Sequence, residues 1–488
     1  MFFERRSKLA SKNINVILIL SDEHRFDCIG AYGNNEVNTP HIDQIAQEGT
    51  IFDNAFCTYP LCTPSRYSLL TGLYAHQHMG ISNHSTIPKN LDTLPGILRE
   101  NGYYTTAIGK MHFTPTYLDI GFQAMYLAEQ NGPGRYVDDY HNYLKDKGLL
   151  DEIDVIDQID EYRNMAGNEY WENFGALKSN LNEEDYSTSW IAKKAIEKID
   201  SWSARNNYFM MIGFIKPHHP FDPPEPWDKI YDPANLSLLE GWTDKCLELD
   251  LKKYKGYFPN QKLDKSLMKE ILAYYYATIS HVDFWIGKII DKLKEKKLYD
   301  KTLIIYTSDH GDYMGYHHMV LKGGYMYEPL IRIPLIIKYP YSSNNKTSSN
   351  LVNSLDISKT ILSQCNIYKD QFSQGTDLKN GKIQRDAIFA EDINSYMVRT
   401  QSYKLILNKN GENLLFDLDK DPVELFNVYD HKSYSEIREN LKNRIMDWIL
   451  FESAPHSYID EKANLVYNLE DKGNEMRKYI KKNLNNFY

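Results

Sequence analysis

Five short, mostly apolar segments along the chain predict β-strands: residues 15–20, 51–56, 103–108, 208–215 and 301–306. The first of them is apolar after Asn15, which is typical of a parallel strand buried on both faces. Polar residues follow several of these segments. Because the carboxyl ends of parallel strands meet at one edge of a sheet, we expect those polar residues to lie together.

Helical periodicity appears between the predicted strands. Thr39 and Pro40 predict the start of a short helix that Gly49 ends, and residues 91–99 predict another helix. Residues 267–297 form the longest pattern, with one apolar stripe: Ile271, Tyr275, Ile279, Val282, Ile286 and Ile289. Asp283 lies on this helix and is interpreted as a hydrogen-bonded structural residue rather than a catalyst.

Strands that alternate with helices predict an α/β fold, a large mostly parallel sheet flanked by helices. The polar tract 343–349 predicts a loop, and beyond it residues 386–391, 397–407 and 414–418 predict strands, with a hairpin turn at 408–411. A final helix is predicted at 433–451. We therefore expect a smaller C-terminal subdomain, an antiparallel sheet plus helix.

The predicted domains are residues 1–380, the catalytic α/β domain, and residues 381–488, the C-terminal α+β subdomain with a helical tail. Insertions are predicted near 121–200 and 223–262, where the strand and helix patterns loosen. The acidic run 151–157 is interpreted as a solvated surface. The polar tail after Pro455 is either an oligomer arm or a frayed end.

Charge and hydropathy narrow the range of partners. The chain has 488 residues, 42% hydrophobic, and a net charge of −10 from 56 Lys+Arg and 66 Asp+Glu. An acidic chain without a long basic block is poorly suited to wrap nucleic acid, although it can hold a local cationic pocket for a small anion. No apolar run reaches the length of a membrane span. We therefore expect neither a nucleic acid nor a membrane partner, and a homo-oligomer stays open.

The five cysteines are odd in number and irregularly spaced, which argues against a disulfide framework and favours a reducing compartment. Arg5, Arg6 and Lys8 precede the apolar run 16–20, as in a signal peptide. That run is too short and lacks a cleavage site of small residues. The sequence therefore predicts a cytoplasmic protein.

One segment combines residues that point to chemistry on an anion: Cys62-Thr63-Pro64-Ser65-Arg66, followed by Thr71-Gly72. Proline near the start of a helix places the thiol at a helix N-terminus, where backbone N–H groups face an anion. A lone cysteine in that position is more often a small buried residue. A chance match to the whole segment, however, is expected in roughly one in a thousand chains of this length.

This segment resembles the signature of the sulfatase family in the alkaline phosphatase superfamily, in which the cysteine is oxidised to formylglycine. Four further segments resemble the family's other motifs in the same order: Ser21–Arg25 with Ala31–Asn34, Gly109–His112, Pro217–Pro220, and Ser308–Asp312 with Lys322 and Arg332-x-Pro334. The resemblance extends from Asn15 to about Phe451.

The resemblance implies one divalent metal ion, held by Asp22, Asp309, His310 and the modified Cys62. Three oxygen donors and one imidazole suit Ca²⁺, Mg²⁺ or Mn²⁺ rather than a thiolate-bound zinc, and Ca²⁺ is favoured among these ions. Many sulfatases carry a second aspartate where Glu23 stands here. Whether Glu23 contacts the metal is left open.

The resemblance also implies the roles of the remaining site residues. Arg66 holds the hydrated formylglycine through hydrogen bonds, and His112 takes a proton from its second hydroxyl. Lys110, His218 and Lys322 surround the anion, and His218 or Lys322 protonates the leaving oxygen.

The function implied is hydrolysis of a small-molecule or saccharide sulfate ester, after a formylglycine-generating enzyme has modified Cys62. One alternative is a phosphonate or phosphate ester hydrolase with the same nucleophile, favoured by His310 and by Gly324-Tyr325. A second alternative is a catalytically silent anion-binding relative. A two-metal phosphatase is disfavoured, because no second Asp/His ligand set is found. The alcohol half of the substrate is expected to be recognised by the two insertions.

Overall fold

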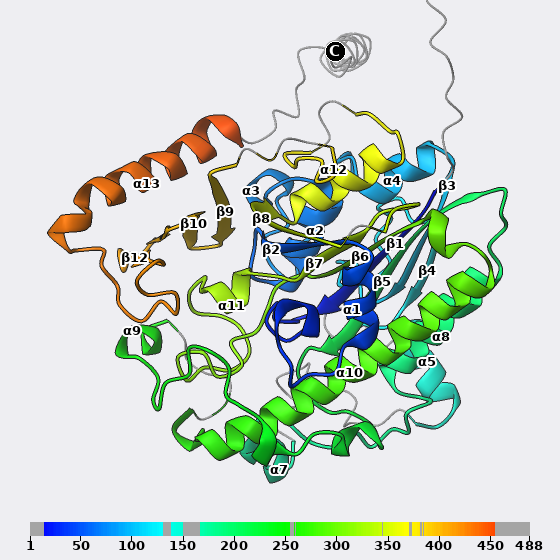
Figure 1. The fold of residues 1–488 in the computed structure, drawn as a ribbon, viewed down its shortest axis with the longest axis horizontal. Helices are drawn as coiled ribbons and strands as arrows, with labels where there is room; N and C mark the ends of the chain where they lie inside the picture. The colour runs from blue at the N-terminus through cyan, green and yellow to red at the C-terminus, as the bar shows by residue number, and fades with distance from the viewer. Residues whose placement is uncertain are drawn as a thin grey trace, which may run out of the picture. The chain divides into compact units, whose positions relative to one another are not determined.

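The computed structural model describes residues 14–129, 138–149, 166–253, 258, 260–343, 345–369, 373–380, 383 and 385–453 (Figure 1). Contacts divide the chain into two units, Met1–Ile445 and Met446–Tyr488, and both β-sheets belong to the first unit. The predicted class is confirmed: a large mostly parallel sheet with helices accompanies a small antiparallel C-terminal sheet. The domain boundary after residue 380 stays a prediction.

The large sheet has the strand order β4-β3-β5-β1-β6-β7-β2-β8. β7 runs antiparallel to both of its neighbours, and the other pairs are parallel. The strands are β1 (Asn15–Asp22), β2 (Thr50–Phe56), β3 (Tyr103–Gly109), β4 (Ala124–Leu127), β5 (Asn207–Pro217), β6 (Thr302–Ser308), β7 (Leu335–Lys338) and β8 (Lys346–Asn353).

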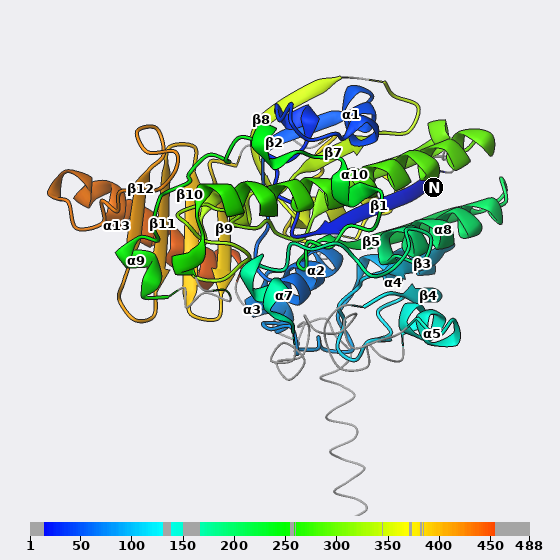
Figure 2. The same cartoon turned by 90° about the horizontal axis from the view of Figure 1, so that it is seen from below.

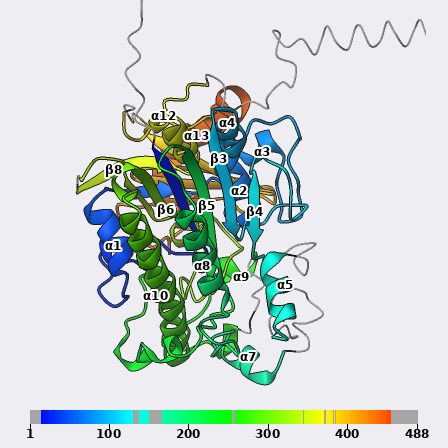
Figure 3. The same ribbon diagram turned by 90° about the vertical axis from the view of Figure 1, so that its right-hand side faces the viewer.

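Helices cover both faces of this sheet (Figures 2 and 3). Alternate residues of β1 point to opposite faces, so Ile17 and Ile19 join one hydrophobic cluster while Val16 and Leu18 join the other. The first cluster includes α1 (Pro40–Gln47), α8 (Ser187–Asp200) and α10 (Lys265–Glu295). The second includes α2 (Cys62–Thr71), α4 (Leu94–Glu100) and α12 (Leu355–Gln364).

The small sheet has the order β12-β11-β10-β9. Its strands are β9 (Ala387–Asp392), β10 (Ser395–Thr400), β11 (Tyr403–Asn408) and β12 (Leu414–Asp417). The predicted turn at 408–411 is confirmed, with Gly411 N donating to Asn408 O at 2.9 Å. The prediction of one strand over 397–407 was wrong, because the chain reverses between Thr400 and Tyr403 and forms the antiparallel strands β10 and β11.

The polar tract 343–349, predicted as a loop, was also assigned incorrectly. Residues from Lys346 onward form β8, which pairs with β2 at the edge of the large sheet. An edge strand has one neighbour and leaves side chains in water, so polar residues such as Ser348 and Asn350 are compatible with it.

The predicted insertions contain regular elements of their own. Residues 121–200 include β4 and α8, and residues 223–262 include α9 (Glu248–Leu251). The other α-helices are α3 (Ala75–His78), α5 (Asp139–Asp146), α7 (Asn168–Glu172), α11 (Glu328–Ile331) and α13 (Ser435–Asp447). The acidic run 151–157 and the tail after Pro455 lie outside the described residues. In the part of the chain that is described, no helix is both long and apolar enough to cross a membrane.

Asp283 on α10 has the structural role expected of it. Its side chain is 1% exposed, and its Oδ1 accepts hydrogen bonds from His41 N at 3.0 Å and Ile42 N at 2.7 Å. These donors lie in the first turn of α1, whose N-terminal residue Thr39 makes no capping hydrogen bond with its own side chain. A carboxylate from the neighbouring helix therefore caps α1.

We expect Asp283→Ala to destabilise the protein by about 1–3 kcal/mol, because it leaves buried N–H groups of α1 without an acceptor. Thermal or denaturant unfolding measures the loss. Asp291→Ala removes an exposed carboxylate from the same helix and should change stability little. Equal effects of the two substitutions would contradict the capping role.

Candidate active site

The predicted site residues lie at the carboxyl ends of four adjacent parallel strands. β3, β5, β1 and β6 are neighbours in the sheet, and β1 pairs with β6 so that Ser21 is opposite Ser308. The residues at or just after these strand ends are Lys110 and His112 (β3), His218 (β5), Asp22 (β1), and Asp309 and His310 (β6). The expectation that Asp22 and Asp309 share one sheet edge is confirmed.

Gly109, the last residue of β3, allows the backbone to bring Lys110 into this edge. Its φ is +85°, and a Cβ there would collide with the carbonyl oxygen of Gly213 on β5. Lys110 N donates to that same oxygen at 2.8 Å. A glycine at this position therefore permits β3 and β5 to stay close where the Lys110 segment begins.

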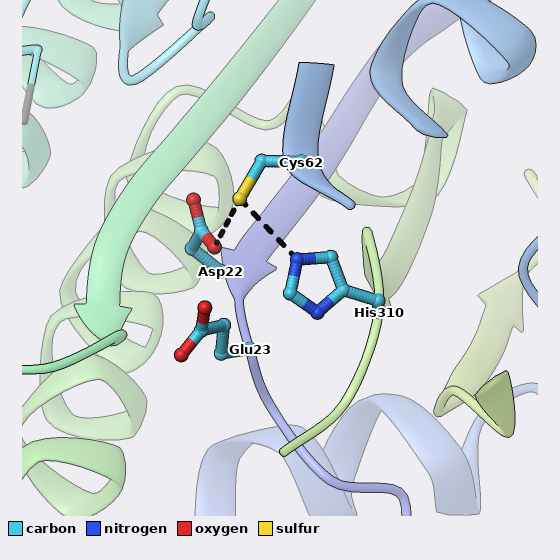
Figure 4. A group of neighbouring side chains, drawn as sticks. All are labelled: Asp22, Glu23, Cys62 and His310. Atoms are coloured by element: carbon cyan, nitrogen blue, oxygen red, sulfur yellow. Dashed lines mark hydrogen bonds between the residues drawn. The ribbon is translucent and has the colours of Figure 1, made fainter. Parts of the chain in front are cut away.

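Cys62 is the first residue of α2 and is fully buried, as expected for a thiol at a helix N-terminus. Its Sγ lies 3.6 Å from Asp22 Oδ1 and 3.3 Å from His310 Nε2 (Figure 4). The Nδ1–H of His310 can donate to Gly311 O at 2.8 Å, which leaves the Nε2 lone pair facing Cys62. Burial, together with the charge of Asp22, raises the pKa of the Cys62 thiol well above its usual value.

Arg66 lies one turn further along α2 and bridges the two acidic strand ends. Its Nε is 2.8 Å from Asp309 Oδ2, and its terminal NH2 nitrogen is 3.0 Å from Asp22 Oδ2. Its other terminal nitrogen donates to Lys110 O, and Lys110 Nζ is 2.5 Å from Asp22 Oδ2. Burial alone would raise the pKa of Asp22, but Lys110 and Arg66 outweigh it and hold that pKa well below its usual value.

Four buried side chains could hold a metal ion: Asp22, Glu23, Cys62 and His310. One ligand atom from each lies within 4.8 Å of the others. Figure 4 shows that they come from the end of β1, the start of α2 and the segment after β6. Glu23 Oε2 is buried and has no hydrogen-bond partner among the described residues, so it is free to bind a ligand. Two carboxylates and an imidazole fit a divalent cation.

Asp309 is placed differently from these four side chains. Its Oδ2 faces Arg66, and its Oδ1 accepts from Glu23 N at 3.3 Å and His310 N at 3.0 Å. Its assignment as a metal ligand stays a prediction. The sequence left open whether Glu23 contacts the metal. Its side chain is one of the four that could hold the ion.

Lys322 and His218 reach the same site from two separate loops. Lys322 Nζ lies 3.4 Å from Cys62 Sγ and 3.0 Å from His218 Nε2, and it also contacts Glu23. His218 Nε2 is 3.2 Å from Glu23 Oε1. Burial lowers the pKa of Lys322 to about 8, although the negative charge of Asp22 opposes that shift. A lysine with such a pKa can give up a proton near neutral pH.

His112 is buried in the same site, near the charges of Lys110 and Asp22. Burial, assisted by the positive charge of Lys110, lowers the pKa of His112 well below its usual value. Neither ring nitrogen has a hydrogen-bond partner among the described residues. A neutral imidazole of this kind is suited to accept a proton.

Two residues that support the site carry no signal in the sequence. Glu129 accepts hydrogen bonds from Met111 N and His112 N at 2.9 and 3.0 Å, and Asn83 Oδ1 accepts from Thr63 N at 3.1 Å. Neither Glu129 nor Asn83 belongs to a recognisable motif. Their role follows only from the folding of distant segments onto α2 and the end of β3.

Comparisons with known proteins agree with this geometry. A family profile described as "Sulfatase" matches residues 14–367, and one described as "N-sulphoglucosamine sulphohydrolase, C-terminal" matches residues 315–449. An arylsulfatase of Clostridium perfringens is 30% identical over an alignment of 455 positions, which covers 86% of this chain and 91% of that protein. An N-acetylglucosamine-6-O-sulfatase of Bacteroides thetaiotaomicron is 26% identical, covering 89% of this chain and 86% of that protein.

Among solved structures, a phosphonate monoester hydrolase of Agrobacterium radiobacter shares the fold with a TM-score of 0.75. The two proteins are 24% identical, and the match covers 89% of this chain and 95% of the other.

We expect Arg66→Met to destabilise the protein by about 3–5 kcal/mol at neutral pH, because it leaves two buried carboxylates without their shared cation. The loss should shrink as the pH falls from neutral into the acid range, because without Arg66 the burial of Asp22 raises its pKa, and the protonated carboxyl no longer needs the cation. Unfolding at several pH values measures this. Arg99→Met, which changes an exposed arginine, serves as the control. A pH-independent loss would contradict the electrostatic explanation.

Proposed function

This chain belongs to the sulfatase family and is an arylsulfatase-like sulfuric ester hydrolase; we propose that it cleaves sulfate monoesters through a formylglycine derived from Cys62 and one divalent metal ion. One observation carries the proposal. Cys62 is buried at a helix N-terminus with Asp22 and His310 on one side and the Lys322 ammonium 3.4 Å away on the other. An anion bound there would meet both a nucleophile and positive charge.

The donor set supports a metal ion beside residue 62. Asp22, His310, the modified Cys62 and Asp309 are the proposed ligands, and the unpartnered Oε2 of Glu23 makes this residue a further candidate. Formylglycine would supply an oxygen nucleophile that can also release sulfate, and the metal would lower the pKa of that oxygen and polarise the ester. The oxygen-rich donors suit Ca²⁺, Mg²⁺ or Mn²⁺ rather than a thiolate-bound zinc, and of these ions we propose Ca²⁺.

The remaining side chains handle protons and charge. Lys110, His218 and Lys322 surround the sulfate, and His218 or Lys322 protonates the leaving oxygen. The Lys322 pKa of about 8 suits such a proton donor. His112, with both ring nitrogens free of protein partners among the described residues, takes a proton from the nucleophile. Arg66 keeps the two acidic strand ends in place and can hydrogen-bond the side chain at position 62.

The proposed substrates are small-molecule or saccharide sulfate esters, and similarity to an N-acetylglucosamine-6-O-sulfatase favours sulfated sugars. A formylglycine-generating enzyme would be the partner that modifies Cys62. A cytoplasmic location is proposed from the few, irregularly spaced cysteines.

We expect Cys62→Ala to lower kcat/KM for an aryl sulfate by on the order of 10⁴ or more, as for other nucleophile deletions. Cys62→Ser should not turn over either, because a serine hydroxyl lacks the second hydroxyl that releases sulfate. Cys365→Ala, at a partly exposed cysteine on another element, is the control. Mass spectrometry of the peptide that contains residue 62 should show an aldehyde or its hydrate. An intact thiol in fully active protein would refute the proposal.

A second candidate function is phosphonate monoester hydrolysis, favoured by His310 in the site and by the shared fold with a phosphonate monoester hydrolase. Paired assays with an aryl sulfate and an aryl phosphonate that share one leaving group separate the two functions. We expect a higher kcat/KM for the sulfate. The reverse order would assign the chain to the second function, and metal and sulfate binding without turnover of either ester would indicate a silent relative.

A further inference from the structure

The buried carboxylate of Glu129 contacts the backbone of His112 and has no role in the proposed reaction. Glu129 follows β4 and is 2% exposed. Its Oε1 lies 2.9 Å from Met111 N and 3.0 Å from His112 N, and its Oε2 lies 3.1 Å from His112 N. One side chain thus accepts hydrogen bonds from two consecutive amides, which fixes the segment that carries His112.

The backbone of His112 needs such anchors. Its φ is +57°, in the left-handed region that a residue with a Cβ rarely adopts. Glu129 binds its N–H, and the hydroxyl of Thr63 donates to its carbonyl oxygen at 2.8 Å. Thr63 is the neighbour of Cys62 on α2. The backbone of His112 is therefore held between Glu129 and the helix that carries the nucleophile.

The ring of His112 has no anchor of its own. The side chain is 1% exposed, yet neither Nδ1 nor Nε2 has a hydrogen-bond partner among the described residues. Many catalytic histidines are oriented by a carboxylate on the second ring nitrogen. Here the carboxylate contacts the backbone instead, so the position of the ring depends on the backbone contacts of Glu129 and Thr63.

Glu129 has no competing role in the part of the chain that is described. No lysine or arginine lies within ion-pair distance of its carboxylate, and burial raises its pKa to about 7 although the two amides oppose that shift. Its own N–H donates to Asp138, which also binds His141 at the start of α5. A buried carboxylate is unfavourable unless its hydrogen bonds compensate. The amides of Met111 and His112 are the hydrogen-bond donors to the carboxylate.

We propose that Glu129 is a positioning residue, which holds the imidazole of His112 where it takes a proton from the reacting oxygen. The proton transfer rests on the proposed function, whereas the anchoring of the His112 backbone does not. The residue acts through His112 and touches neither the ester nor the metal ligands.

The test compares Glu129→Gln and Glu129→Ala with Glu100→Gln, which changes an exposed glutamate on α4. Glutamine preserves the shape, and its one carbonyl oxygen can still accept from both amides, as Oε1 of Glu129 does. We expect kcat for an aryl sulfate to fall about 100-fold in Glu129→Ala, which removes both hydrogen bonds, the low end of what one acid–base group contributes. Glu129→Gln, which loses only the contact of Oε2 with His112 N, should fall by no more than about 10-fold. KM should change little, and Glu100→Gln should match the unmodified protein. A Glu129→Ala protein with unchanged kcat would overturn the proposal.

A double-mutant cycle separates positioning from general destabilisation. If Glu129 acts through His112, then Glu129→Ala added to His112→Ala should lower kcat no further. A full additional loss in the double variant would show that Glu129 acts by another route and would overturn the proposal.

Amide hydrogen exchange of residues 110–113 measures, without any substrate, whether Glu129 holds the backbone at Met111 and His112. We expect the Met111 and His112 amides to exchange faster in Glu129→Ala than in the unmodified protein or Glu100→Gln. If the unmodified protein hydrolyses no sulfate, the proposed function fails while faster exchange in Glu129→Ala still supports the anchor. Unchanged exchange in Glu129→Ala would refute the anchor even in a protein that is an active sulfatase.

Discussion

The site depends on one buried guanidinium. Arg66 joins Asp22 and Asp309, the acidic ends of β1 and β6, and all three side chains are fully shielded from water. Two carboxylates brought together without a cation would repel each other and would become protonated. Arg66 lies on α2 four residues after Cys62, so the same helix that presents the nucleophile also neutralises the strand ends beneath it.

Around this centre, several residues point a side-chain atom into the site while other hydrogen bonds hold the rest of the residue in place. Glu23 and His310 keep ligand atoms aimed at residue 62, while their own backbones or second ring nitrogens are fixed by Asp309 and Gly311. His112 follows the same principle, with its backbone held by Glu129. Because these hydrogen bonds use the backbone or the second ring nitrogen, the atoms that face the site stay free. The side chains are already in place, so little conformational entropy is lost when the substrate binds.

Polar and apolar patterns along the chain gave wrong secondary-structure predictions where the tertiary environment decided the outcome. The polar residues of β8 were compatible with a strand only because that strand lies at the sheet edge beside β2. Only residues 401 and 402 lie between β10 and β11, so the two short strands looked like one. Glu129 and Asn83 act through the carboxylate and amide that they offer to distant backbone groups. No spacing along the chain encodes such a contact.

By itself, the sequence determined the α/β class, the buried strands with polar ends and the segment from Cys62 to Arg66 at the start of a helix. Those features are local, since they follow from hydrophobic periodicity, helix capping and a short motif. The tertiary structure decided the strand order that brings β1 and β6 together, the convergence of Glu23 with Asp22, and the contact of Glu129 with the His112 backbone. These features join residues up to hundreds of positions apart, and such pairings are chosen by packing and by the need to satisfy buried charges and amides.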